Sequence, residues 1–294
     1  MINKAKGNMI SKNAAVLIIG ASGQLGFDLM RAFGDRAVGL THKDVEICDP
    51  QQVKEIIKNH KPGLVINVAA FVKAEECEIK PELCFNVNAV GAFNVAKAAS
   101  DVGAAIVYLS SDYVFDGSKQ SFREDDAVNP LNVYGASKAA GEILTKIANK
   151  QYYIVRSSWF FGANLPHKGL DFPRKMLALA REKSEVRVVN DQFGSPTYTK
   201  DLAFKIKEVV QGAPCGVYHI TNQGVASWFD FAKEVLRVSG SNIKPSPIPT
   251  SESGSKIRRP KSSVLESMKL KKLKIGLLRP WQEALPDFFK EISR

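Results

Sequence analysis

A tyrosine and a lysine four positions apart, Tyr134 and Lys138, are the side chains whose types and spacing most directly suggest catalysis. Residues i and i+4 lie on one face of a helix, so the phenol and the ammonium would be neighbours. A free tyrosine has a pKa of about 10, and a nearby cation stabilises the phenolate and lowers that pKa. The spacing therefore predicts a group that exchanges protons near neutral pH.

Two adjacent hydroxyls, Ser110 and Ser111, follow the apolar run 104–109, which is predicted to be a buried strand. Open α/β sheets bind ligands where their strands end, so a hydroxyl there would orient a substrate carbonyl. A Tyr-x-x-x-Lys spacing alone is common on exposed helices. Its combination with these hydroxyls and with a glycine loop favours a catalytic group.

The glycine loop has the spacing G-x-x-G-x-x-G, with Gly20, Gly23 and Gly26 directly after the apolar run 15–19. Glycines permit a tight turn and let backbone N–H groups approach a pyrophosphate at the start of the following helix. Because the loop follows a predicted strand near the start of the chain, it predicts a dinucleotide site.

The second predicted strand, 37–40, runs into His42 and Lys43 rather than into the carboxylate that would bind an NAD ribose. A lysine at this point would receive a 2′-phosphate, so the sequence predicts NADPH as the cofactor. Asp44 and Glu46 follow closely, which leaves NADH possible.

Short apolar runs alternate with helical patterns, which predicts a doubly wound parallel (Rossmann) α/β sheet with a smaller, partly interleaved C-terminal α/β substrate region. Strands are predicted at 15–19, 37–40, 63–68, 104–109, 152–156, 185–190 and 217–221, and helices at 51–59, 82–102, 133–148, 172–183, 200–211 and 228–239. Residues 241–255, rich in Ser and Pro, are predicted to be a loop.

Three regions are expected along the chain. Residues 1–13 form a flexible tail, 14–158 a dinucleotide-binding domain, and 159–294 mainly a substrate-binding region. Within the last region, about 186–212 is expected to return to the Rossmann half.

Composition narrows the class of protein. The 294 residues are 45% hydrophobic, which is typical of a globular chain, and no apolar run reaches the ~18–20 residues of a membrane span. The four cysteines form no C-x-x-C pair, so reduced thiols in a cytoplasmic protein are expected. The net charge of +11 favours an anionic small molecule. A nucleic-acid partner is not predicted, because no nucleic-acid motif accompanies the charge.

Longer segments resemble the extended short-chain dehydrogenases/reductases, and in particular the dTDP-4-dehydrorhamnose reductase family. Two are the most specific, S-S-D-Y-V-F-D-G at 110–117 and D-Q-F-G-S-P-T at 191–197. The other matching segments are 20–26, 65–70, 129–142, 155–162, 189–198, 216–220, 227–231, 259–263 and 280–281.

The resemblance implies NADPH-dependent reduction of the C4 ketone of dTDP-4-dehydro-L-rhamnose to dTDP-L-rhamnose. Tyr134 would be the proton donor and Lys138 its partner, and Ser111 stands where the family has a catalytic threonine. Together with the glycine loop and Lys43, it implies cofactor contacts from Gly20, Gly23, Gln24, Leu25, Gly26, Lys43, Glu46, Ile47, Ala70, Phe71, Val72, Tyr134 and Lys138. Substrate contacts would come from Ser111, Asp112, Tyr113 and Trp159. Arg258 and Arg259 would clamp a diphosphate.

The sequence departs from the family pattern at Glu46, Val72, Ser111 and 73–76, which loosens the assignment of the substrate. Two alternatives stay open: an NADP-binding regulatory subunit resembling the β subunit of methionine adenosyltransferase, and a reductase or epimerase for another nucleotide sugar. A monomer or a homodimer is expected. Mg²⁺, which some family members bind, is not predicted, because the sequence shows no ligand cluster.

Overall fold

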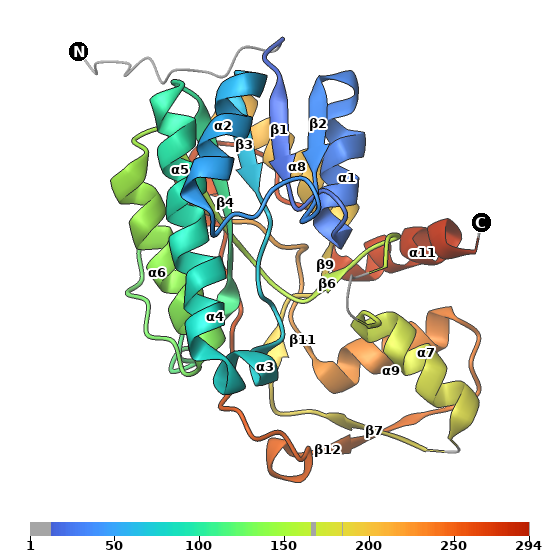
Figure 1. The fold of residues 1–294 in the computed structure, drawn as a ribbon. Helices are drawn as coiled ribbons and strands as arrows, with labels where there is room; N and C mark the ends of the chain where they lie inside the picture. Colours follow the sequence, from blue (N-terminus) through green and yellow to red (C-terminus); the bar gives the residue numbers. More distant parts are fainter. Residues whose placement is uncertain (1–12, 166–168, 184, 294) are drawn as a thin grey trace.

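Six parallel strands form the central sheet, in the order β10-β5-β4-β3-β1-β2 (Figure 1). The computed structural model describes residues 13–165, 169–183 and 185–293, so the expected tail lies, except for Asn13, outside the described residues. The strands are β1 Val16–Ile19, β2 Ala37–Leu40, β3 Leu64–Asn67, β4 Ala105–Ser111, β5 Tyr152–Ser157 and β10 Gly216–His219. The predicted doubly wound parallel fold is confirmed.

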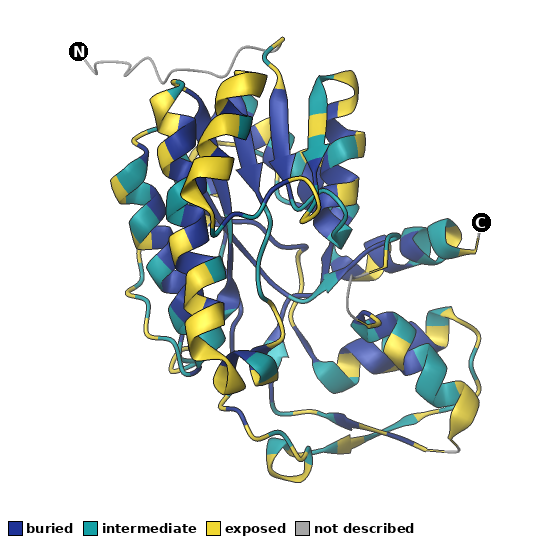
Figure 2. Cartoon of the chain, in the orientation of Figure 1, coloured by how far each residue is buried: buried dark blue, intermediate teal, exposed yellow. Residues whose placement is uncertain are grey.

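Helices cover both faces of this sheet, and the inner strands β1, β3, β4 and β5 are buried, whereas the edge strand β2 is partly exposed (Figure 2). On β1, Val16 and Ile18 join the core under α1 and α8, whereas Leu17 and Ile19 join the core under α2 and α5. Burial on both faces explains why the strands read as continuous apolar runs. These helices are α1 Gln24–Phe33 and α8 Thr199–Gly212 on one face, and α2 Pro50–His60, α5 Ala92–Asp101 and α6 Val133–Ala148 on the other.

The helix predicted over 82–102 is interrupted. It begins as α4 (Pro81–Phe85), widens into the π-helical turn η2 (Asn86–Gly91) and continues as α5. At this turn the Asn88 carbonyl accepts a hydrogen bond from the Tyr108 hydroxyl of β4 (2.8 Å). Such turns often occur at functional sites. A short helix, α3 (Ala74–Ile79), precedes α4.

The C-terminal region packs around a cluster of aromatic side chains that includes Phe161, Phe231 and Phe288. Its helices are α7 Phe172–Glu182, α9 Trp228–Val238, α10 Met268–Lys272 and α11 Trp281–Ile292. Its strand pairs are β6 Phe160–Phe161 with β9 Thr197–Tyr198, β7 Val186–Val189 with β12 Pro245–Ile248, and β8 Phe193–Gly194 with β11 Ala226–Ser227. Short 3₁₀ turns are η1 Gly34–Arg36, η3 Asp112–Val114 and η4 Thr250–Glu252.

The structure adds detail to two expectations about this region. Residues 241–255 are not only loop, because β12 runs parallel to β7 and the Ile248 carbonyl accepts from the Asn190 N–H (3.0 Å). The backbone nitrogens of Pro245 and Pro247 point away from β7, toward the unpaired edge of β12, where no N–H donor is needed. The pairing also places β7 outside the six-stranded sheet, so within 186–212 only α8 packs on the Rossmann half, against α1.

Among the residues that the structure describes, no helix has the length and apolar character of a membrane span.

The end of α2 offers a stability test. Lys61 caps this helix in the left-handed region (φ 44°, ψ 51°), which costs a side chain with a Cβ roughly 1 kcal/mol. We expect Lys61→Gly to raise the free energy of unfolding by about 0.5–1 kcal/mol in urea titrations. The matched control Lys54→Gly, in the exposed middle of α2, should lower it by about 1 kcal/mol. Equal losses in both variants would contradict the prediction.

Candidate functional site

The glycine loop after β1 leaves the start of α1 open to an anion. A Cβ at Gly20 (φ +91°) would lie 2.8 Å from the Ala69 nitrogen, and one at Gly26 would lie 2.2 Å from the Gly20 carbonyl oxygen. Gly23 is the N-cap of α1 and no side chain caps the helix, so its first N–H groups are available to a phosphate. The loop therefore has the shape and polarity of a dinucleotide cradle.

Two C-terminal side chains that sequence reasoning missed hold this loop. The Asn164 amide donates to the Ser22 carbonyl (3.0 Å), and the Gln24 amide donates to the Asp171 carboxylate (2.8 Å). Asp171 also caps α7 by accepting from the Arg174 N–H. The cap could be recognised from the Asp-Phe-Pro sequence, but the contact with residues about 150 positions earlier left no local signal.

The end of β2 exposes the cationic side chains expected there. His42 and Lys43 lie at the surface, and the Asp44 carboxylate turns back to accept from the N–H and hydroxyl of Thr41 (2.7 Å each). These hydrogen bonds lower the Asp44 pKa, so the group is ionised at neutral pH. Glu46 accepts from the Cys48 N–H (3.0 Å). Ile47 is buried and its carbonyl accepts from Asn94 (3.0 Å).

The loop after β3, with Ala70, Phe71 and Val72, is tied to α6 through Asn88. The Asn88 amide accepts from the Phe71 N–H (2.8 Å) and donates to the Phe71 carbonyl (2.9 Å) and to the Ser137 hydroxyl (2.9 Å). Val72 is exposed. Asn88 was not among the predicted site residues, because no sequence motif in its helix indicates contacts with Phe71 and Ser137, which are distant in the sequence.

Ser111 and Tyr134 meet where β4 ends and α6 begins. The Ser111 hydroxyl donates to the Asp112 carboxylate (3.0 Å) and accepts from the Tyr113 N–H (3.2 Å). It also lies close enough to the Tyr134 phenol to lower the pKa of that phenol. Asn132 caps α6 by accepting from the Gly135 N–H (2.8 Å), which starts the helix directly before Tyr134. The strand end and the helix start thus fix the hydroxyl against the phenol.

The phenol of Tyr134 differs electrostatically from the expectation. Burial raises its pKa well above the ordinary value, and the neighbouring Asp112 acts in the same direction, while the nearby Ser111 hydroxyl only partly opposes them. The lowering predicted from the Tyr134–Lys138 spacing is therefore outweighed by burial. A protonated phenol at neutral pH can donate a proton.

Lys138 lies one helical turn after Tyr134 and is buried. Its ammonium stands over the Tyr108 ring, 4.1 Å from the ring centroid. Burial lowers the Lys138 pKa to about 7, and the nearby Glu142 and Cys84 oppose this shift. The charge of this lysine therefore changes close to neutral pH.

Asp112 is a buried carboxyl beside the same hydroxyl. It accepts from Ser111 and from the Ser263 hydroxyl (2.5 Å), which joins the C-terminal region to the end of β4. Burial raises the Asp112 pKa to about 6, although both hydrogen bonds favour the charged form.

The two aromatic side chains expected to line a sugar site, Tyr113 and Trp159, pack against different aromatic partners. Tyr113 meets the Tyr134 ring edge to face, with centroids 6.0 Å apart. Trp159 has a left-handed backbone (φ 50°) and stacks on Trp228 with centroids 3.5 Å apart. A Cβ at Gly194 would lie 2.5 Å from the Trp159 indole, so glycine is required there.

The arginines expected to clamp a diphosphate have other partners in this structure. Arg259 pairs with Glu75 and hydrogen-bonds Tyr113, while the Arg258 carbonyl accepts from Asn132 (3.0 Å) and the residue is exposed.

Five side chains thus converge at the end of β4: Ser111, Asp112, Tyr113, Tyr134 and Lys138. The glycine loop follows β1, which is separated from β4 by β3. Lys43 and Glu46 follow β2, and Trp159 follows β5. Among the described residues, no group of three or more His, Cys, Asp or Glu side chains is arranged to hold a metal ion.

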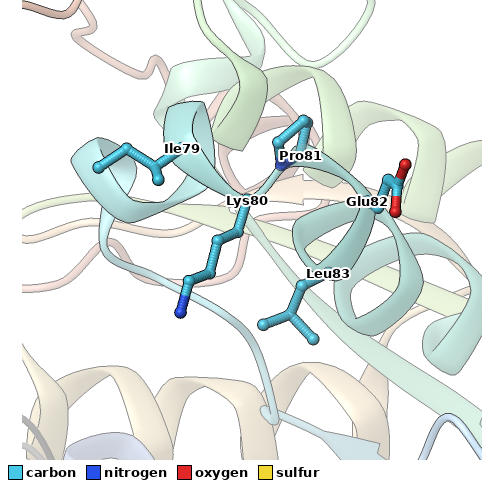
Figure 3. A pocket seen from close by; sticks show the side chains of 5 residues that line it. All are labelled: Ile79, Lys80, Pro81, Glu82 and Leu83. Carbon is cyan, nitrogen blue, oxygen red and sulfur yellow. The ribbon is translucent and has the colours of Figure 1, made fainter.

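A separate hollow lies at the turn between α3 and α4 (Figure 3). Ile79, Lys80 and Leu83 point to one side of it and Glu82 points away. Its lining combines exposed apolar side chains with one ammonium, and it does not contain the Ser111–Tyr134–Lys138 group.

Comparison with known proteins places the chain. Residues 14–294 match the family model described as the RmlD substrate binding domain. The chain is 39% identical over 282 residues to the spore coat polysaccharide biosynthesis protein SpsK of Bacillus subtilis, covering 95% of this chain and 98% of the relative. It is 34% identical over 279 residues to the dTDP-4-keto-6-deoxy-D-glucose reductase of Streptomyces niveus, covering 93% and 96%.

The crystal structure of dTDP-4-dehydrorhamnose reductase from Bacillus anthracis in complex with NADP is similar throughout. Its TM-score is 0.91 at 36% identity, over 95% of this chain and 99% of that chain.

Asp112 generates a prediction about stability. Its folded pKa of about 6 lies above the ordinary 3.8, so the fold favours the protonated carboxyl and the free energy of unfolding falls as pH rises from about 4 to 6. Since asparagine does not ionise, Asp112→Asn should be more stable than the wild type at pH 7, by up to about 3 kcal/mol. The gain should vanish near pH 4 in thermal or urea unfolding.

The matched control is Asp116→Asn. Asp116 is a partly exposed carboxylate whose pKa is lowered by hydrogen bonds from Ser118 and Asn129, so its replacement should give no gain at pH 7. A gain for Asp112→Asn that persists unchanged at pH 4 would refute a titration effect.

Proposed function

Because the chain belongs to the dTDP-4-dehydrorhamnose reductase family of NAD(P)H-dependent oxidoreductases, we propose that it reduces the C4 ketone of dTDP-4-dehydro-L-rhamnose to dTDP-L-rhamnose, with NADPH as cofactor. The observation that carries the proposal is the placement of the Tyr134 phenol at the start of α6, beside the Ser111 hydroxyl at the end of β4 and one helical turn before the buried Lys138. This arrangement can protonate an oxygen at the end of β4.

The residues present fit the cofactor. The Gly20–Gly26 loop approaches its neighbours too closely for a Cβ at either end, and the uncapped start of α1 would take the phosphates, with contacts from Gly23, Gln24 and Leu25. Lys43, exposed at the end of β2, would take the 2′-phosphate. The remaining proposed cofactor contacts are Glu46, Ile47, Ala70, Phe71, Val72, Tyr134 and Lys138.

When bound, NADPH supplies the hydride that reduces C4. Ser111 and Tyr134 hold the ketone oxygen through their hydroxyls and stabilise the negative charge that develops on it. Tyr134 then delivers its proton to that oxygen, so that a hydroxyl group results. Lys138 as an ammonium stabilises the phenolate that remains until solvent restores the proton.

The two regions of the chain divide the binding. Residues 14–158 would bind the dinucleotide, and 159–294 mainly the sugar nucleotide. Asp112, Tyr113 and Trp159 are proposed to line the sugar site; the Trp159 indole is fixed by its stack on Trp228. Release of Arg259 from Glu75 would be required before its guanidinium could bind a diphosphate.

A second candidate is reduction of another dTDP-4-keto-6-deoxy sugar. It is favoured by the 34% identity to the Streptomyces niveus enzyme, whose name gives the D-gluco substrate. The Ser111–Tyr134–Lys138 group would serve either sugar, because it acts on the ketone and not on the ring substituents.

The function is tested by NADPH oxidation at 340 nm with dTDP-4-dehydro-L-rhamnose made in situ from dTDP-glucose. We expect substrate-dependent oxidation, and loss of at least 100-fold in kcat for Tyr134→Phe, since phenylalanine has no proton to donate. NADPH affinity of that variant should stay within about threefold, measured by nucleotide fluorescence. Full turnover by Tyr134→Phe would exclude the assigned role.

Other results of this assay separate the alternatives. Oxidation only with dTDP-4-keto-6-deoxy-D-glucose, assayed directly, would support the second candidate. Tight NADPH binding without turnover of either sugar, together with co-purification of a larger enzyme, would instead support a regulatory subunit.

The cradle gives a separate prediction. A Cβ at Gly23 would lie 3.4 Å from the nearest atom, the Gly20 carbonyl oxygen, and its φ of −72° suits any residue, so Gly23→Ala should fold. Its methyl group would stand among the N–H groups proposed to bind phosphate. We expect the dissociation constant for NADPH to rise about tenfold or more, with about 1 kcal/mol of stability lost.

Gly26→Ala is the contrasting variant, because its Cβ would lie 2.2 Å from a backbone oxygen. It should lose several kcal/mol of stability as well as NADPH binding. Unchanged NADPH affinity in Gly23→Ala would place the phosphates elsewhere.

A further inference from the structure

We propose that Glu142 is a positioning residue for the catalytic group: it fixes the end of β4 through Ser110, and its charge, partly balanced by Arg156, acts on the Lys138 ammonium. The inference rests on the proposed function, because it assigns Glu142 through residues placed in that reaction.

The first step is the placement of Glu142 on α6. Tyr134, Lys138 and Glu142 are spaced i, i+4 and i+8, so they form one stripe along the helix. Glu142 is 2% exposed, although an ionised carboxylate is costly to bury. A buried carboxylate in line with the phenol and the ammonium needs an explanation.

The second step is how the carboxylate is held. Its Oε1 accepts from the Ser110 hydroxyl (2.6 Å) and from Arg156 Nε (2.8 Å), and its Oε2 accepts from Arg156 Nη2 (2.7 Å). The two-point contact with the guanidinium fixes the orientation of the carboxylate.

The third step connects Glu142 to Ser111. Ser110 directly precedes Ser111, and these last two residues of β4 pair in register with Arg156 and Ser157 of β5. Glu142 therefore binds one side chain from each of the two strands at the point where the sheet ends. It holds Ser111 in position through Ser110, without contact with a substrate.

The fourth step concerns charge. Titratable and charged groups from several elements surround Lys138. Tyr108 lies on β4, Cys84 on α4 beside Cys77 of α3, and Tyr134 and Glu142 on α6. Beyond Glu142 lies the guanidinium of Arg156 on β5. Glu142 supplies the carboxylate of this set, and its negative charge raises the Lys138 pKa against the lowering by burial.

Arg156 carries the opposite charge to Glu142, and Glu142 is the carboxylate that it contacts among its described hydrogen bonds. Its Nη1 lies 3.4 Å from the Glu124 carbonyl and 3.3 Å from the His219 ring. Burial and Arg156 lower the His219 pKa to about 3, so that ring is neutral. The Glu142–Arg156 pair is therefore a dipole beside Lys138, and its negative end, the Glu142 carboxylate, lies on the same helix as Lys138.

The test compares Glu142→Gln, Arg156→Gln and the double variant with the wild type. The protonation of Lys138 is followed by NMR of the lysine Cε in the folded protein, and the Lys138→Met variant assigns the signal. This readout does not require turnover. The pH dependence of kcat/KM is measured beside it.

We expect opposite shifts. In Glu142→Gln the Lys138 titration should move to lower pH by about one unit, and the alkaline fall of kcat/KM should move with it. In Arg156→Gln both should move to higher pH. The double variant should lie between Glu142→Gln and the wild type, because the nearer of the two charges dominates.

A purely structural ion pair would behave differently. It would lower stability and kcat in both single variants without moving the titration, or would move it in the same direction in both. Either result would overturn the proposal. Should the single variants fail to fold, the double variant carries the test, since removing both charges leaves no unpaired ion. An unshifted titration in it would then be decisive.

The control is Asp201→Asn, which removes a carboxylate from the Asp201–Arg279 pair at α8 and leaves the titration of Lys138 in place. The two proposals fail separately. A wild type that oxidises no NADPH with either sugar contradicts the proposed function, whereas an active wild type with the same Lys138 titration in every variant contradicts only the role of Glu142.

Discussion

The approach of the Ser111 hydroxyl to the Tyr134 phenol is the arrangement on which the site depends. It exists because β4 extends to Ser111 and α6 starts at Val133, capped by Asn132. The end of β4 is held by its pairing with β5, which extends to Ser111 and Ser157, and the first turn of α6 is held by the Asn132 cap. Small displacements of either would separate the two hydroxyls and remove the proton donor from its oxygen.

Burial has opposite effects on chemistry and on stability at this junction. It keeps the Tyr134 phenol protonated and brings the Lys138 pKa to about 7. It also places a carboxyl, Asp112, where its charge is disfavoured. The apolar clusters on both faces of the sheet offset these costs. The site thus shows the ordinary conflict between a reactive environment and a stable one.

The sequence predicts features that have local patterns. The glycine loop, the six strands and the Tyr134–Lys138 spacing each follow from neighbouring residues, and all reappear in the structure. What it could not predict depends on tertiary contacts: the Asn88 bridge, the Asp171–Gln24 contact and the strand β12, whose prolines suit only an edge. The protonation of Tyr134 belongs to the same class, because a spacing identifies a cation but not the depth of burial.

The division between chemistry and selectivity follows from where these contacts lie. In the proposed reaction the β4–α6 junction binds the ketone oxygen and supplies a proton, and neither role depends on the configuration of the sugar ring. The C-terminal region meets this junction through the hydrogen bond from Ser263 to Asp112. Trp159, which follows β5, has its indole fixed by Trp228 and Gly194. Substitutions among those residues would change which sugar reaches the phenol without changing the reaction. Relatives named for different 4-keto sugars are consistent with a shared junction under a varied C-terminal region.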